Sequence, residues 1–288
     1  MTIFLPLIYL LAGYAMGHTR WDIKALASLL LTRLIIPLVI IYNVSSHFHA
    51  MSGIIVVTAL LMLILLSIGR RLSRDPVQHL CFCYLNIGWL GLPIVSALFS
   101  AQAVVIVIAA YVGSSIFGNS IGAGMLSGAG LDLKGLVKTP PVLALGAGIV
   151  LIPFGEQIAQ FGEGLYDIAK FLMSLLGMAI LGIWLGKVRV TAADFREELR
   201  PFLLRGGVIF LLVSAMLLVA HLSGFQTLTD NAAALYLFCL LPPAANIIVL
   251  ETHYLGTGRS ARAISCGTCI SIVAIAIYAA AIVLSRMM

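Results

Sequence analysis

Two membrane-length apolar stretches, far apart in the chain, are each interrupted by proline and asparagine. The first contains residues 86–93, NIGWLGLP, and the second contains residues 242–246, PPAAN. A proline inside a helix removes a backbone hydrogen bond and clashes with the preceding turn. Because hydrocarbon offers no water to the freed groups, such a break persists in a membrane only where protein or a cavity covers it. Paired breaks in two halves of a chain indicate the binding site of a secondary transporter.

The composition is that of a membrane protein. Apolar residues make up 61% and charged residues 10% of the 288-residue chain, whereas soluble domains are about 25% charged. A membrane-spanning helix needs about 20 apolar residues. The sequence divides into ten such stretches, at 2–17, 24–44, 50–69, 78–99, 101–124, 139–154, 164–186, 203–222, 231–254 and 261–285. Little remains for a catalytic or nucleotide-binding module, so we expect a protein that is not an enzyme and holds no cofactor or metal.

Basic residues are confined to alternate predicted loops. Fourteen of the 17 Lys and Arg residues fall in odd-numbered loops, with Arg205 assigned to the seventh, and none falls in an even-numbered loop. The positive-inside rule then places the odd loops in the cytoplasm and both termini outside. This pattern explains the net charge of +6 by contact with membrane lipid, so we expect no nucleic-acid partner.

The predicted spans form two halves. Five precede the linker at 125–138 and five follow it, so residues 1–124 and 139–288 are the predicted repeats. An odd number of spans in each half gives the halves opposite orientations. The expected fold is all-α, with ten transmembrane helices in two inverted five-helix repeats and with helices 4 and 9 broken and crossing. The polar stretch before the eighth span reads as a short interfacial helix that ends at Pro201.

The two breaks supply the candidate site. A broken helix leaves free N–H groups and the positive end of its dipole inside the membrane, and two such ends suit an anion. Asn86 and Asn246 could contact this ligand or only satisfy the freed backbone groups. The predicted substrate-binding residues are Asn86, Gly88, Gly91, Pro93, Pro242, Pro243, Asn246, Arg33 and Asn119.

Other polar residues in the spans have two readings each. Arg33 lies about ten residues into its span, or roughly 15 Å, and faces either a functional cavity or a structural partner. Lys170 either contacts the substrate or, because it is close to the outer edge, snorkels to the membrane surface. Glu251 and His253 could carry a coupled proton or form an ordinary polar helix end. Asn119 belongs to a polar stripe that serves either helix packing or the ligand.

These residues resemble a known family. Residues 86–94 resemble the Asn-x-Gly-x-x-Gly-x-Pro signature of the fourth helix in auxin efflux carriers. Residues 241–246, followed by Glu251 and Tyr254, resemble the ninth helix, and the step from Arg33 to Pro37 is similar to the second. The resemblance implies a scaffold of helices 1, 2, 6 and 7, a mobile transport domain of helices 3–5 and 8–10, and a homodimer.

The resemblance also implies the kind of substrate. Members of that family move organic anions, including auxin in plants and malate or malonate in bacteria. This chain lacks the long hydrophilic loop of the plant carriers, which favours a compact bacterial protein of the inner membrane. We therefore expect a secondary carrier of small mono- or dicarboxylates that works by alternating access. The alternatives are a sodium- or proton-coupled carrier of the bile-acid or antiporter type, which would place acidic residues near the crossover, and a membrane sensor that transports nothing.

Overall fold

The computed structural model describes residues 5–19, 24–128, 137–138, 140–187 and 189–287, and these residues are almost entirely helical. No β-strand occurs among them, and the one isolated β-bridge joins Leu85 to Pro243. Within the described part of the chain, four helices are long and apolar enough to cross a membrane: Met51–Leu72, Ile152–Lys187, Ala192–Leu222 and Ser260–Ser285. The prediction of an all-α membrane protein is confirmed at this level.

The first half of the chain folds into helices that the prolines and glycines subdivide. They are α1 (Leu5–Gly17), α2 (Lys24–Leu30), η2 (Leu31–Ile35), α3 (Ile36–Leu72), α4 (Pro76–Cys83), η3 (Ile87–Gly91), α5 (Leu92–Leu98), α6 (Ala101–Phe117), η4 (Gly118–Gly122) and α7 (Ala123–Ser127). α3 contains the end of the predicted second span and all of the third. Its backbone leaves helical geometry at His47, which lies between these two predicted spans.

The second half shows the same subdivision. Its helices are α9 (Pro140–Val150), η5 (Ile152–Phe154), α10 (Gly155–Lys187), α11 (Ala192–Leu222), α12 (Gln226–Asp230), α13 (Ala232–Tyr236), η6 (Leu237–Leu240), α14 (Asn246–Leu255) and α15 (Ser260–Met287). The prediction that Pro201 ends a short interfacial helix is wrong. Pro201 lies inside α11, so the polar turns and the apolar stretch form one continuous helix that carries charged residues from the surface into the protein.

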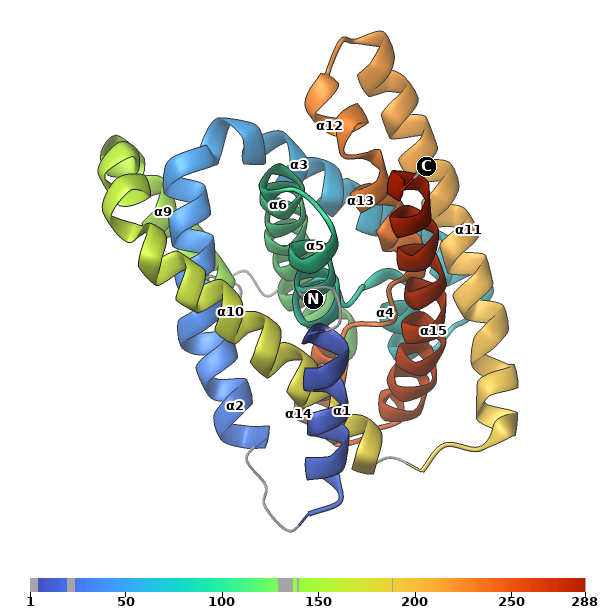
Figure 1. Ribbon diagram of the computed structural model, residues 1–288. Helices are drawn as coiled ribbons and strands as arrows, with labels where there is room; N and C mark the ends of the chain where they lie inside the picture. Colours follow the sequence, from blue (N-terminus) through green and yellow to red (C-terminus); the bar gives the residue numbers. More distant parts are fainter. Residues whose placement is uncertain (1–4, 20–23, 129–136, 139, 188, 288) are drawn as a thin grey trace.

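Two groups of helices lie on opposite sides of the molecule. Figure 1 shows α2, α9 and α10 on one side, α11 and α15 on the other, and α4, α5 and α6 between them. α1 crosses α10 with backbones in direct contact, because a Cβ at Gly13 or Gly182 would overlap the backbone of the facing helix. Small residues permit this close approach, which is a common means of joining helices in membranes.

Candidate functional site

The two interrupted helices meet at their breaks. Besides the bridge between Leu85 and Pro243, the Asn86 N–H donates to the Pro242 carbonyl at 2.9 Å, and the Ala244 N–H donates to the Tyr84 carbonyl at 2.8 Å. Residues 84–86 and 241–245 thus run antiparallel as a short extended pair, and all are buried. This pairing satisfies backbone groups that hydrocarbon could not. We call residues 84–86 and 241–245 the crossover.

The first break does not lie at Pro93. It lies at residues 84–86, and Pro93 is the second residue of α5, inside a helix that runs on from η3. The wide turns of η3 accommodate the missing donor, since the Leu92 N–H reaches back to the Ile87 carbonyl. In the second break, by contrast, Pro242 and Pro243 occupy the extended segment itself.

Four helix ends converge on the crossover. α4 and η6 end there with their carbonyl ends, and η3 and α14 begin there with their N–H ends. Asn86 is the N-cap of η3, and its Oδ1 accepts from the Trp89 N–H at 3.2 Å. The carbonyl ends carry partial negative charge and the N–H ends carry partial positive charge. Partial charges of both signs therefore meet at the crossover.

Arg205 neutralises the carbonyl ends. Its side chain is only 1% exposed, and its two terminal nitrogens donate to the Cys81 carbonyl at 2.9 Å and to the Leu241 carbonyl at 3.1 Å. The Ser271 hydroxyl donates to the neighbouring Leu240 carbonyl. One guanidinium from α11 therefore ties the end of α4 to the start of the second break, with charge-assisted hydrogen bonds worth about 1.5–3 kcal/mol each.

The sequence analysis missed this role by assigning Arg205 to a cytoplasmic loop. The available signal was its place in the third position of the predicted 203–222 span, since basic residues inside apolar stretches usually have a partner. Arg33, which was predicted to be the important buried charge, is exposed on η2 and joins no other described residue through a hydrogen bond or ion pair. Lys170 pairs with Asp167 at 3.3 Å on α10.

The first break contains buried donors that lack an acceptor. The Nδ2 of Asn86 and the Nε1 of Trp89 are both buried without a hydrogen-bond partner, although both residues are at most 7% exposed. Each atom can only donate. Since nearly all buried polar atoms in proteins have a partner, these two atoms indicate a place for a molecule that brings acceptors.

Glycines let bulky side chains close over the breaks. A Cβ at Gly88 would overlap the Tyr111 ring, and a Cβ at Gly91 would lie 3.3 Å from Leu241 Cδ1. The same crowding extends to α10, where a Cβ at Gly177 would lie 3.1 Å from the Trp89 carbonyl oxygen. The predicted residues Gly88 and Gly91 therefore shape the site through their lack of a side chain.

The remaining predicted residues divide between the crossover and a helix cap. Asn246 begins α14 and is partly buried, and its Nδ2 donates to the Tyr84 hydroxyl at 3.5 Å, which is a weak bond. Glu251 is fully buried and accepts from the backbone N–H groups of Arg259 at 2.7 Å and Ser260 at 2.8 Å. It therefore caps α15, as the polar-helix-end reading describes. The side chains of Asn119 and His253 lie outside those that the structure describes.

Comparison with known proteins adds no assignment. No model of a known protein family matches the chain, and no curated protein matches it. The functional argument therefore depends on the crossover itself.

Proposed function

We propose that this chain is a secondary carrier of small organic anions, with mono- or dicarboxylates such as malate or malonate as its substrates. The observation that carries the proposal is the pair of buried, unpartnered donors at the first break, Asn86 Nδ2 and Trp89 Nε1. A carboxylate has only acceptor atoms when ionised, so it complements such donors.

The charges around the crossover favour the binding of an anion over that of a cation. Arg205 and Ser271 occupy carbonyls at the ends of α4 and the second break, which removes much of the negative field. The N-terminal ends of η3 and α14 both lie at the crossover. The positive end of a helix dipole favours carboxylates and phosphates, and a cation would be repelled by these ends and by the guanidinium.

The proposed architecture is the ten-span, inverted-repeat carrier of the bacterial inner membrane, with both termini outside. In this architecture α1, α2, the first part of α3, α9 and α10 form the scaffold, and the other helices form the transport domain. The backbone contact between α1 and α10 suits a rigid scaffold. α10 also packs against η3 and α5, so movement at that contact would open or close access to the crossover.

The proposal is tested by uptake into liposomes that contain the purified protein. Labelled malate, malonate, lactate and auxin are each supplied under set proton and sodium gradients. We expect saturable uptake of at least one acid, and Asn86→Ala should reduce it by about 10- to 150-fold, because one hydrogen bond to a charged group is worth about 1.5–3 kcal/mol. The matched control is Asn43→Ala, since Asn43 is buried but bonds within its own helix to the Val39 carbonyl at 2.8 Å. Folded protein that takes up none of the acids would overturn the proposal.

A further inference from the structure

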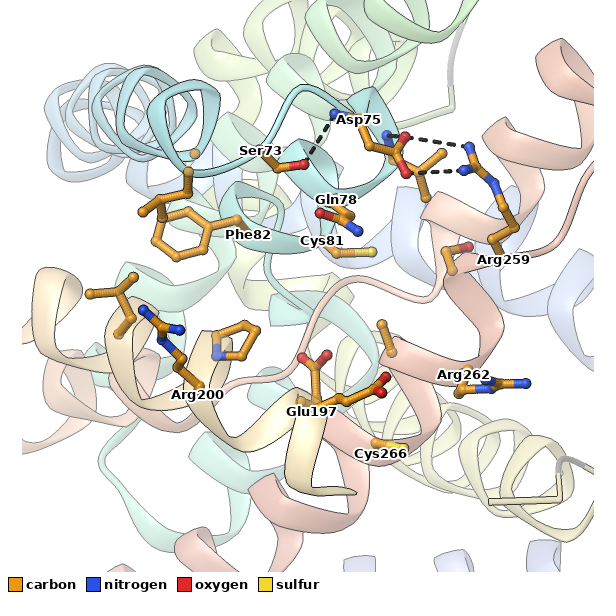
Figure 2. A pocket seen from close by; sticks show the side chains of 18 of the residues that line it. Ser73, Asp75, Gln78, Cys81, Phe82, Glu197, Arg200, Arg259, Arg262 and Cys266 are labelled. Carbon is orange, nitrogen blue, oxygen red and sulfur yellow. Dashed lines mark hydrogen bonds and ion pairs between the residues drawn. The ribbon is translucent and has the colours of Figure 1, made fainter. Parts of the chain in front are cut away.

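A pocket lined by charged residues lies between α4, α11 and α15. Figure 2 shows Asp75 and Cys81 on one wall and Glu197 and Arg200 of α11 on the opposite wall. Arg259, which directly precedes α15, and Arg262 and Cys266 of α15 lie at the side. The pocket encloses about 540 Å³ and extends from exposed charged residues to the buried Cys81 and Cys266. Its rim belongs to the predicted cytoplasmic loops, so water and protons from that side can enter it.

Most charged residues at the rim of the pocket form helix caps or ion pairs. The Asp75 carboxylate caps α4 through the Val77 N–H at 3.1 Å, and Arg259 pairs with it at 3.0 Å. Asp194 closes the capping box of α11, and Arg262 pairs with it at 3.2 Å. These pairs hold the first turns of α4, α11 and α15 together. Two carboxylates of the pocket, Glu197 and Glu198, form no ion pair with another residue that the structure describes, and only Glu198 is partly buried.

Glu198 reaches the crossover from the pocket. It lines the pocket, and its Oε1 lies 3.5 Å from the point that a Cβ of Gly267 would occupy, while Pro243 Cδ lies 2.9 Å from the same point. Neither a hydrogen bond nor an ion pair joins this carboxylate to another residue that the structure describes. Arg205 follows seven residues later on α11, or about two helical turns, with its Nε buried and unpartnered.

We propose that Glu198 is a proton-binding site, open to the predicted cytoplasmic side, that sets the net charge beside the crossover. When Glu198 is ionised, it balances the charge of Arg205. When it takes up a proton, the positive charge of Arg205 and of the two helix N-termini is left uncompensated, and an anion binds more tightly. By reciprocity, a bound anion increases the affinity of Glu198 for its proton. This coupling rests on the proposed carrier function, whereas the proton site does not.

The surroundings of Glu198 favour titration near neutral pH. Glu198 precedes the predicted apolar span 203–222; burial raises the pKa of its carboxyl to about 7, and the positive charge of Arg205 opposes that rise. The thiols of Cys81 and Cys266 also line the pocket. The other charged groups around the pocket are Asp75, Asp194, Glu197, Arg200, Arg259 and Arg262.

Infrared titration of the purified full-length protein tests the proton site without any substrate. The wild type should show a protonated-carboxyl band that grows as the pH falls through about 7, and Glu198→Gln should lack this band. Glu197→Gln is the matched control, because Glu197 lines the same pocket but is exposed, and it should keep the band. A band that survives in Glu198→Gln, or a Glu198 carboxyl that stays ionised until the ordinary range of glutamate near pH 4.3, would overturn the proposal.

Uptake into liposomes tests the coupling. Malate uptake by the wild type should rise as the cytoplasmic-side pH falls, by no more than about tenfold per pH unit, the limit for one linked proton. Glu198→Gln should be insensitive to pH and resemble the wild type at low pH. Equal pH dependence in both proteins would refute the coupling. If the wild type moves no anion at any pH, the carrier function fails, and the infrared titration still decides the proton site.

Discussion

The two breaks carry similar residues but are held in place differently. At the first, Asn86 caps the helix that follows it, and the Tyr111 ring covers Gly88. At the second, Pro242 and Pro243 form the extended segment, and Arg205 binds the carbonyl before it from another helix. Arg205 also binds the Cys81 carbonyl beside the first break, but among the described residues only the first break has a side-chain helix cap of its own, from Asn86. We therefore expect the two breaks to respond differently to substitution.

The largest effect is expected at Arg205. Arg205→Met would leave the Cys81 and Leu241 carbonyls without their donor and Glu198 without its counter-charge. Leaving a buried carbonyl without a partner costs about 1–3 kcal/mol, and two carbonyls lose their donor here. Thermal denaturation of the purified protein in detergent measures this loss. Arg196→Met is the control, because Arg196 is exposed on the same helix, and it should melt close to the wild type. Equal melting of both variants would show that the second break is not held by Arg205.

A smaller loss is expected at Gly88. Gly88→Ala places a methyl group against the Tyr111 ring, and overpacking of this kind costs about 1–3 kcal/mol. Gly53→Ala is a matched control, since no atom lies within 4 Å of the added Cβ in α3. Combining Gly88→Ala with Tyr111→Leu should recover part of the melting temperature that Gly88→Ala loses. No recovery would mean that the ring is not what excludes a side chain at this position.

The smallest effects on stability separate the two asparagines. Asn86→Ala removes a helix cap and should cost about 1 kcal/mol. Asn246→Ala removes only a 3.5 Å contact with the Tyr84 hydroxyl and should leave the melting temperature within error, while both variants lower anion uptake. Parallel melting and uptake measurements on both proteins test this. Equal destabilisation by the two substitutions would remove the difference between the breaks.

Local chemistry made part of this protein predictable from its sequence. High hydropathy predicts helices because their backbone bonds are internal, and four helices of spanning length are present. Proline and asparagine located both interruptions to within a few residues, although Pro93 lies inside a helix because the wide turns of η3 absorb its missing donor. These features depend on residues close together in the chain.

Only the tertiary structure decided which polar residues belong to the crossover. Arg33 and Arg205 both lie in apolar stretches, yet Arg33 is exposed and Arg205 is buried against carbonyls 124 and 36 residues away. Glu251 caps α15. Glu198 lies near Pro243 of the second break, because α11 continues through Pro201. Hydropathy and proline act locally, so sequence reveals them. The partner of a buried charge depends on the path of the whole chain, because a charge leaves water only where the fold brings distant hydrogen-bonding groups to it.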